Sequence, residues 1–147
     1  MRGPGGPLLV SLRPAMILAC ATARQFALWL DTAVQPLARG VLEADLASLR
    51  VGGGHECRRR NRQASGKLSE HANGKAIDIF GFAFEQRDLA ISVAGAGDPK
   101  RQRFLDAARA TACGFFTTVL GPGDAAHGDH LHLDTQDRRS SASRYCN

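Results

Sequence analysis

Residues 76 to 84 read Ala76-Ile77-Asp78-Ile79-Phe80-Gly81-Phe82-Ala83-Phe84, a run of apolar and aromatic residues interrupted by one carboxylate. Residues of this kind predict a β-strand, and Leu89–Val93 predicts a second strand that is joined to the first as a hairpin. In a regular strand, Asp78 shares a face with Phe80 and Phe82. A charge on an apolar face is strongly unfavourable without a partner, and a bound metal ion would supply one.

Immediately before this strand the sequence reads Ser69-Glu70-His71-Ala72-Asn73-Gly74-Lys75. His71 and Asp78 are seven positions apart, and Gly74 between them allows the backbone to turn before the strand begins. A loop and the strand after it can therefore deliver an imidazole and a carboxylate to one point. Zinc accepts both ligands, and a catalytic zinc site usually has three protein ligands and an open position for water.

A second segment, residues 127–132, reads His127-Gly128-Asp129-His130-Leu131-His132. A strand from His130 to Asp134 places His130 and His132 on one face and the intervening leucines on the core face. Four of the chain's five histidines lie in these two segments, beside acidic residues and apolar β-like runs. The pattern predicts a metal site on adjacent strands. The alternation leaves open whether His130 or His132 is the ligand from this strand. Asp129 is placed to take a proton from a metal-bound water.

Two helices are expected to form the scaffold around this sheet. The spacing of apolar residues from Met16 to Leu30 predicts a helix that continues until Pro36 disrupts it. Asp98 is a good N-cap with Pro99 at the first helical position, and Gly114 is expected to stop that second helix.

The length of 147 residues fits one domain with one hydrophobic core. Because residues 115–120 predict a further strand, the expected fold class is α+β, with a small antiparallel sheet that carries the metal site and is flanked by helices. We expect residues 1–13 to be a flexible N-terminal segment and residues 14–147 to form the domain. The apolar run near the N-terminus is too short for a clear signal peptide, and no stretch is long enough for a transmembrane helix.

The charge and the cysteines restrict the environment of the protein. A net charge of +5 with a pI near 9.5 suggests an anionic partner, such as an acidic polymer. Nucleic acid is disfavoured, because the chain has one Trp and one Tyr and its basic residues are not interleaved with aromatic ones. An even number of widely spaced cysteines favours two disulfides in an oxidising compartment over free thiols, with three pairings open. The candidates are Cys20, Cys57, Cys113 and Cys146.

The motif Ser-x-His-x-x-Gly-x-Ala-x-Asp at residues 69–78, joined to Asp-His-x-His at residues 129–132, resembles the bacterial extensin-like C-terminal domain family. That family in turn resembles the zinc D-alanyl-D-alanine carboxypeptidases and related peptidoglycan endopeptidases. Matching stretches run from about Pro14 to Cys146, which is nearly the whole chain. The resemblance implies a fold of the hedgehog or D-Ala-D-Ala carboxypeptidase type.

The resemblance also implies roles for individual residues. It makes His71, Asp78 and His132 the ligands of Zn²⁺, so that His130 lies behind the ligands as a supporting residue. Asp129 becomes the general base, and His127 helps to stabilise the oxyanion of the transition state.

The related carboxypeptidases hold the substrate with an arginine upstream of the first histidine, for which a guanidinium fork is well suited. The candidates in this chain are Arg58, Arg59, Arg60 and Arg62, and Arg58 is favoured because it follows Cys57 directly as in the family pattern. Ser69 is the second residue expected to contact substrate.

The expected function is that of a zinc metallopeptidase, a hydrolase that cleaves an amide bond in the peptide stems of peptidoglycan by metal-activated water. The alternative is a non-catalytic module that binds the cell wall and retains the fold and the metal site. The expected location is periplasmic or extracellular, as inferred from the cysteines and the resemblance, and the expected state is a monomer without nucleic acid.

Overall fold

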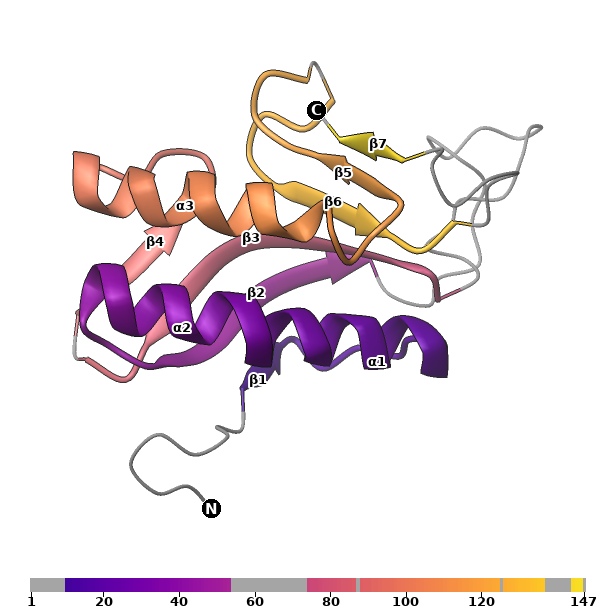
Figure 1. Ribbon diagram of the computed structural model, residues 1–147, viewed down its shortest axis with the longest axis horizontal. Helices are drawn as coiled ribbons and strands as arrows, with labels where there is room; N and C mark the ends of the chain where they lie inside the picture. Colours follow the sequence, from indigo (N-terminus) through magenta and orange to yellow (C-terminus); the bar gives the residue numbers. More distant parts are fainter. Residues whose placement is uncertain (1–9, 54–73, 87, 125, 137–143, 147) are drawn as a thin grey trace.

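A twisted sheet with helices packed together on one of its faces forms the body of the computed structural model (Figure 1). The structure describes residues 10–53, 74–86, 88–124, 126–136 and 144–146. In chain order the elements are β1 (Ser11–Arg13), α1 (Cys20–Trp29), η1 (Leu30–Val34), α2 (Gln35–Leu37), η2 (Ala38–Leu42), β2 (Leu46–Gly53), β3 (Ala76–Phe84), β4 (Ala90–Ser92), α3 (Pro99–Ala112), β5 (Thr118–Leu120), β6 (Leu131–Asp134) and β7 (Tyr145–Cys146).

The strands lie in the order β1-β2-β3-β6-β5-β7, with β4 also paired to β3. The α+β class and the β3–β4 hairpin are therefore confirmed. The expectation of an antiparallel sheet is wrong. The sheet is mixed, because β1 runs parallel to β2 and β5 runs parallel to β7. Parallel neighbours need a crossover connection, and the long helical run between β1 and β2 provides one. The segment expected to be a flexible lead-in, residues 1–13, thus contributes β1 with its last three residues.

The first helical run begins later and ends later than the sequence predicts. It starts at Cys20, passes through Pro36 without a break and ends at Leu42, where Glu43 follows with a φ of 54°. The π-type segments η1 and η2 flank the short α2 that contains the proline. A π-type turn is wider than an α-turn, so it relieves the contact between the proline ring and the preceding turn.

The expectation that Phe82 shares a face with Asp78 is wrong, because β3 is not a regular strand. Arg50 of β2 pairs with Gly81 of β3, but the next residue, Val51, pairs with Ile79. The register thus moves by one residue along β2 and by two residues along β3. A bulge at this point leaves an extra residue in β3 and reverses the side-chain alternation beyond it. Phe82 is therefore buried, with its ring centroid 5.3 Å from that of a phenylalanine of α3.

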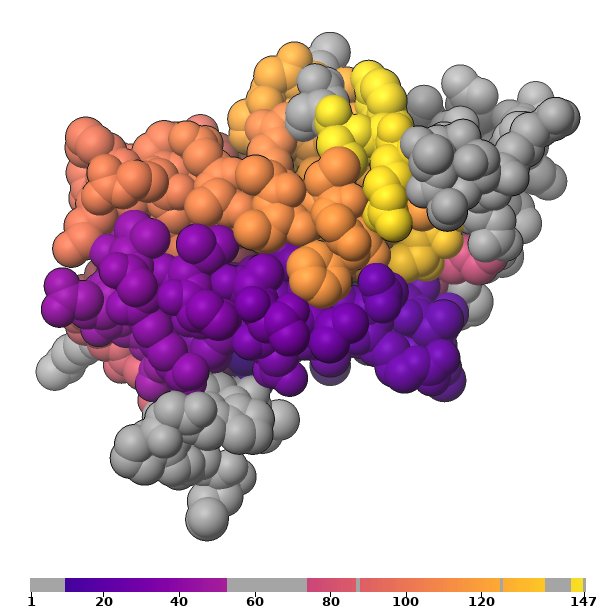
Figure 2. Space-filling model, viewed as in Figure 1, coloured from indigo at the N-terminus to yellow at the C-terminus, as the bar shows by residue number. Residues whose placement is uncertain are grey.

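The hydrophobic core lies between the helices and the sheet. Trp29 of α1 is fully buried at the centre of this core. The Trp29 Nε1 donates a hydrogen bond to Thr111 Oγ1 of α3 over 3.1 Å. The Trp29 ring also meets Phe116 edge-on, with ring centroids 5.8 Å apart. In Figure 2 α3 lies against the first helical run, whose α1 end extends beyond it. The N-cap prediction for α3 is confirmed, since Asp98 Oδ1 accepts a hydrogen bond from the Arg101 backbone N–H.

Gly74 connects the start of β3 to the start of α1. Its carbonyl accepts a hydrogen bond from the Ala19 N–H, and its φ is +70°. A Cβ at Gly74 would lie 2.8 Å from the Ala19 nitrogen. We expect Gly74→Ala to lower the free energy of unfolding by about 1–3 kcal/mol, because it adds both backbone strain and a contact with backbone.

Chemical denaturation of Gly74→Ala and Gly40→Ala checks this expectation. Gly40 lies in η2, where a Cβ would meet nothing within 4 Å, so its replacement should raise the free energy of unfolding by about 0.5–1 kcal/mol. Equal midpoints for the two variants would contradict the conformational role of Gly74.

One disulfide joins Cys113, just after α3, to Cys146 in β7. This is one of the pairings that the sequence left open. Cys20 is exposed at the first residue of α1, and Cys57 lies outside the described residues. In the described ranges we find no helix with the length and hydrophobicity of a membrane-spanning segment.

Candidate functional site

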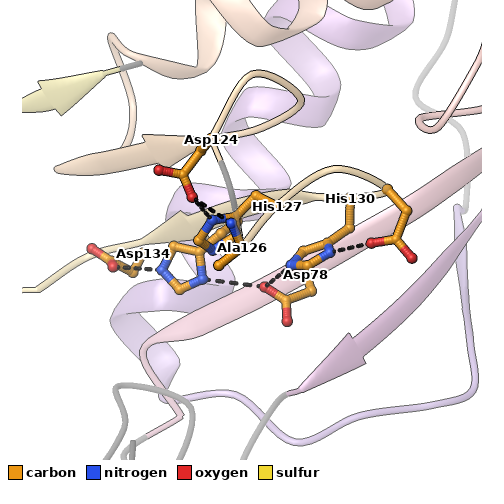
Figure 3. A network of polar contacts seen from close by, with 8 residues as sticks. Asp78, Asp124, Ala126, His127, His130 and Asp134 are labelled. Atoms are coloured by element: carbon orange, nitrogen blue, oxygen red, sulfur yellow. Dashed lines mark hydrogen bonds and ion pairs between the residues drawn. The ribbon is translucent and has the colours of Figure 1, made fainter. Parts of the chain in front are cut away.

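Asp78 and His132 meet across two neighbouring strands on the sheet face that is turned away from the helices. They are direct partners in the antiparallel pairing of β3 with β6, and His132 Nδ1 lies 3.2 Å from Asp78 Oδ1. The register follows from the core: Ile77 and Ile79 on β3, and the leucines of β6, are buried on the helical side. Because side chains alternate along a strand, the residues between them point to the opposite face. Figure 3 shows the resulting cluster of polar side chains.

Asp134 holds the other side of the His132 ring. His132 Nε2 is 2.8 Å from Asp134 Oδ2, and Asp134 is 2% exposed. Burial opposes the protonated form of His132, but the hydrogen bonds to Asp134 and Asp78 outweigh it and raise the His132 pKa to about 9. Burial likewise opposes ionisation of Asp134, yet its contact with His132 keeps the pKa of this carboxyl below 3.8. The imidazole is thus fixed between two carboxylates.

His130 lies beside this pair. Its Nδ1 is 2.8 Å from Asp129 Oδ1, its Nε2 is 3.9 Å from Asp78 Oδ1, and its ring centroid is 5.0 Å from that of Phe80. The Asp129 side chain is 68% exposed. The hydrogen bond with His130 lowers the pKa of Asp129, so this carboxylate is ionised at neutral pH. Asp129 therefore faces solvent next to the site and is oriented by His130.

His127 approaches from the loop between β5 and β6. Its ring centroid is 5.0 Å from that of His130 and 5.6 Å from that of His132. Its Nδ1 contacts Asp124 Oδ2, and this hydrogen bond lowers the pKa of Asp124. The turn that carries both residues is closed by a hydrogen bond from the His127 N–H to the Asp124 carbonyl. Three imidazoles therefore lie next to one another, and Figure 3 shows His127 and His130 on the same side of β3 as Asp78.

Comparison with known proteins identifies the family of this chain. The family model described as "Extensin-like protein C-terminus" matches residues 7–147. The chain belongs to this extensin-like family. No curated protein and no solved structure matches the extensin-like chain.

The structure of the extensin-like domain brings together five of the residues that the sequence singled out. These are Asp78, His127, Asp129, His130 and His132. His71, Arg58 and Ser69 lie outside the described residues, so the third expected ligand and the expected substrate contacts are not placed. Within the described ranges, no three histidine, cysteine or acidic side chains form a group that could hold a metal ion.

Sequence reasoning missed two carboxylates of the extensin-like site, Asp134 and Asp124. The signal for Asp134 was present, because a residue two positions after His132 in a strand lies on the same face. Asp124 stands three residues before His127 in the sequence, but only the turn geometry shows that the two side chains meet.

Proposed function

We propose that this extensin-like domain is a zinc-dependent peptidase that hydrolyses an amide bond in the peptide stems of peptidoglycan. The observation that carries the proposal is the position of the His132 ring, with Nδ1 at Asp78 and Nε2 at the buried Asp134. A histidine that binds a metal usually donates its other ring N–H to a carboxylate, which fixes both the tautomer and the ring plane. The motif resemblance supplies the substrate class.

The donor chemistry fits zinc. One carboxylate oxygen and one imidazole nitrogen lie 3.2 Å apart on rigid strands, and His71 would be the third ligand. When bound by His71, Asp78 and His132, zinc supplies a Lewis acid for the scissile carbonyl and lowers the pKa of water. Binding requires neutral His132, so the proton that Asp78 and Asp134 stabilise leaves as the metal enters.

The remaining residues handle protons and charge. Asp129 is ionised and exposed beside the ligands, where it accepts the proton of the attacking water and passes it to the leaving amine. His130 orients Asp129 through the 2.8 Å contact. His127, held by Asp124, donates a hydrogen bond to the oxyanion that develops on the carbonyl.

The composition and the disulfide support the setting that we propose. A net charge of +5 favours an acidic polymer, and the Cys113–Cys146 disulfide favours an oxidising compartment. On these grounds we propose that the enzyme acts in the periplasm or outside the cell, and we expect it to be a monomer.

A non-catalytic module that binds the wall is the second candidate function. The observation that favours it is the pair of carboxylates on His132, which satisfies a protonated ring without any metal. Such a module would bind peptidoglycan and release no new amine from it.

Elemental analysis of purified, oxidised protein tests the first proposal against the second. We expect about one zinc per chain, followed by the appearance of new amines when muropeptides are added. Protein that contains no metal, and that takes up no added zinc at micromolar concentrations, would remove the hydrolase proposal and favour the binding module.

Asp134 gives a graded test of the same site. We expect Asp134→Ala to weaken zinc binding by about 10–100-fold, because the ring loses the carboxylate that orients it. Asp134→Asn should have a smaller effect, since its amide oxygen still accepts a hydrogen bond from Nε2. Competition with a chromophoric chelator measures both affinities. Unchanged affinity in Asp134→Ala would show that Asp134 serves the fold alone.

A further inference from the structure

An arginine on β2 extends the site along the sheet face that carries it. Leu49 and Val51 of β2 are buried, whereas Arg50 between them is exposed and points to the opposite side. The Arg50 guanidinium carbon lies 6.0 Å from the centre of the Phe80 ring, and the Phe80 ring lies 5.0 Å from the ring of His130. A continuous surface therefore leads from the guanidinium to the proposed catalytic residues.

Arg50 is held in place by two contacts with Phe80. Its Nη2 donates a hydrogen bond to the Phe80 carbonyl over 3.2 Å, and the ring contact fixes the plane of the guanidinium. Other arginines pair with carboxylates, such as Arg39 with Asp45 over 2.6 Å and Arg101 with Asp98 over 3.4 Å. Among the described residues, no carboxylate lies within ion-pair distance of Arg50, and the Arg50 charge acts on Asp129 only from farther away, where it helps to lower the pKa of that carboxyl. The exposed guanidinium therefore keeps N–H donors that a ligand can use.

A glycine makes room for this arrangement. Gly52 is the cross-strand partner of Asp78, and a Cβ at Gly52 would lie 3.0 Å from Phe80 Cε1. The absence of a side chain lets the Phe80 ring lie close to β2, under the guanidinium. Arg50 is two residues before Gly52, which corresponds to about 7 Å along the strand.

We propose that Arg50 and Phe80 form a subsite that binds a carboxylate of the substrate within about three residues of the scissile bond. This inference rests on the proposed function, to which it adds a preference for acidic peptides. A guanidinium binds a carboxylate through two parallel hydrogen bonds, which gives geometry as well as charge. Phe80 supplies a flat apolar contact for the neighbouring part of the peptide and keeps the fork in position.

The test uses three stem peptides and two arginine variants. The first peptide carries only a free C-terminal carboxylate, the second carries only free side-chain carboxylates, and the third has every carboxylate converted to an amide. Arg50→Gln removes the fork, while Arg103→Gln removes the same charge from an exposed position on α3. KM and kcat are measured for each protein with each peptide.

We expect Arg50→Gln to raise KM about tenfold for the carboxylated peptide that the subsite binds, with kcat unchanged. The peptide affected identifies the source of the carboxylate. Arg103→Gln and the fully amidated peptide should show less than about a twofold change. An equal rise of KM with all three peptides, or no rise with any, would overturn the subsite.

A binding measurement separates this inference from the proposed function. Chelator-treated protein is titrated with the same peptides by calorimetry, so that neither turnover nor a metal contributes. The parent should bind a carboxylated peptide about tenfold more tightly than the amidated one, and Arg50→Gln should abolish this difference. If the parent hydrolyses none of the peptides, the peptidase proposal fails, and the ratio of the two affinities still decides the role of Arg50.

Discussion

His132→Ala is expected to lose both the bound zinc and all measurable hydrolysis. The substitution removes the Nδ1 atom that faces Asp78 and leaves Asp78 and Asp134 without the ring that separates them. Replacing a residue that only orients a ligand costs about 10–100-fold in metal affinity, so the loss of a ligand should exceed that range.

Asp129→Ala provides the contrast. Asp129 contacts His130 and is largely exposed, so its removal should leave the zinc content near that of the parent. Turnover should fall by about 10²–10⁴-fold, which is the usual contribution of a general base. Elemental analysis and amine release on the same preparations measure both quantities.

Asp106→Ala serves as the control for these two variants, because Asp106 lies on the exposed side of α3 and accepts a hydrogen bond from the Gln102 side chain, away from the site. It should match the parent in metal content and in turnover. Circular dichroism in the near ultraviolet confirms that each variant is folded. Equal loss of zinc from Asp129→Ala and His132→Ala would overturn the separate roles of the two residues.

Trp29→Ala is expected to lower the free energy of unfolding by about 3–5 kcal/mol. The ring is fully buried, packs edge-on against Phe116, and donates a hydrogen bond to Thr111 of α3. Its removal leaves a cavity between the first helical run and α3, and it also leaves the Thr111 hydroxyl without this donor. Both helices cover the sheet on which the site is built.

Two matched variants divide the effect of Trp29 into parts. Trp29→Phe keeps an aromatic ring and loses the N–H donor. We expect the loss of the hydrogen bond to lower the free energy of unfolding by about 1 kcal/mol, and the smaller ring to lower it further. Leu28→Ala changes the neighbouring residue, which is 48% exposed, and should cost less than about 1 kcal/mol. Urea unfolding followed by circular dichroism measures all three variants. A loss as large for Leu28→Ala as for Trp29→Ala would show that the helix, and not the buried ring, carries the stability.

Features determined by local chemistry were predictable from the sequence. The Asp98–Pro99 pair marks the start of α3, and apolar strand residues separated by a short polar stretch mark the β3–β4 hairpin. The alternation of histidine and leucine in β6 correctly separates the core face from the face of the site. In each case the residues that decide the structure lie within a few positions of one another.

Features that depend on distant parts of the chain were not predictable in this way. The bulge in β3 follows from its pairing with β2, and it moves Phe82 to the core face away from Asp78. The passage of the helix through Pro36 depends on packing over the sheet that outweighs the local cost of a proline. The role of Asp134 appears only when the register places His132 between two carboxylates. Arg50 reaches the site only because β2 lies next to β3.

The Cys113–Cys146 disulfide also affects how the protein withstands proteases. The bond closes residues 113–146 into a ring that contains β5, β6 and the site residues Asp124, His127, Asp129, His130, His132 and Asp134. If a protease cuts the backbone once inside this ring, the two pieces stay covalently joined and the strands keep their neighbours. The only immediate change is the gain of one water in mass, and the fragments separate only after a thiol reagent is added. A protein that is exposed to proteases would in this way survive a first cut.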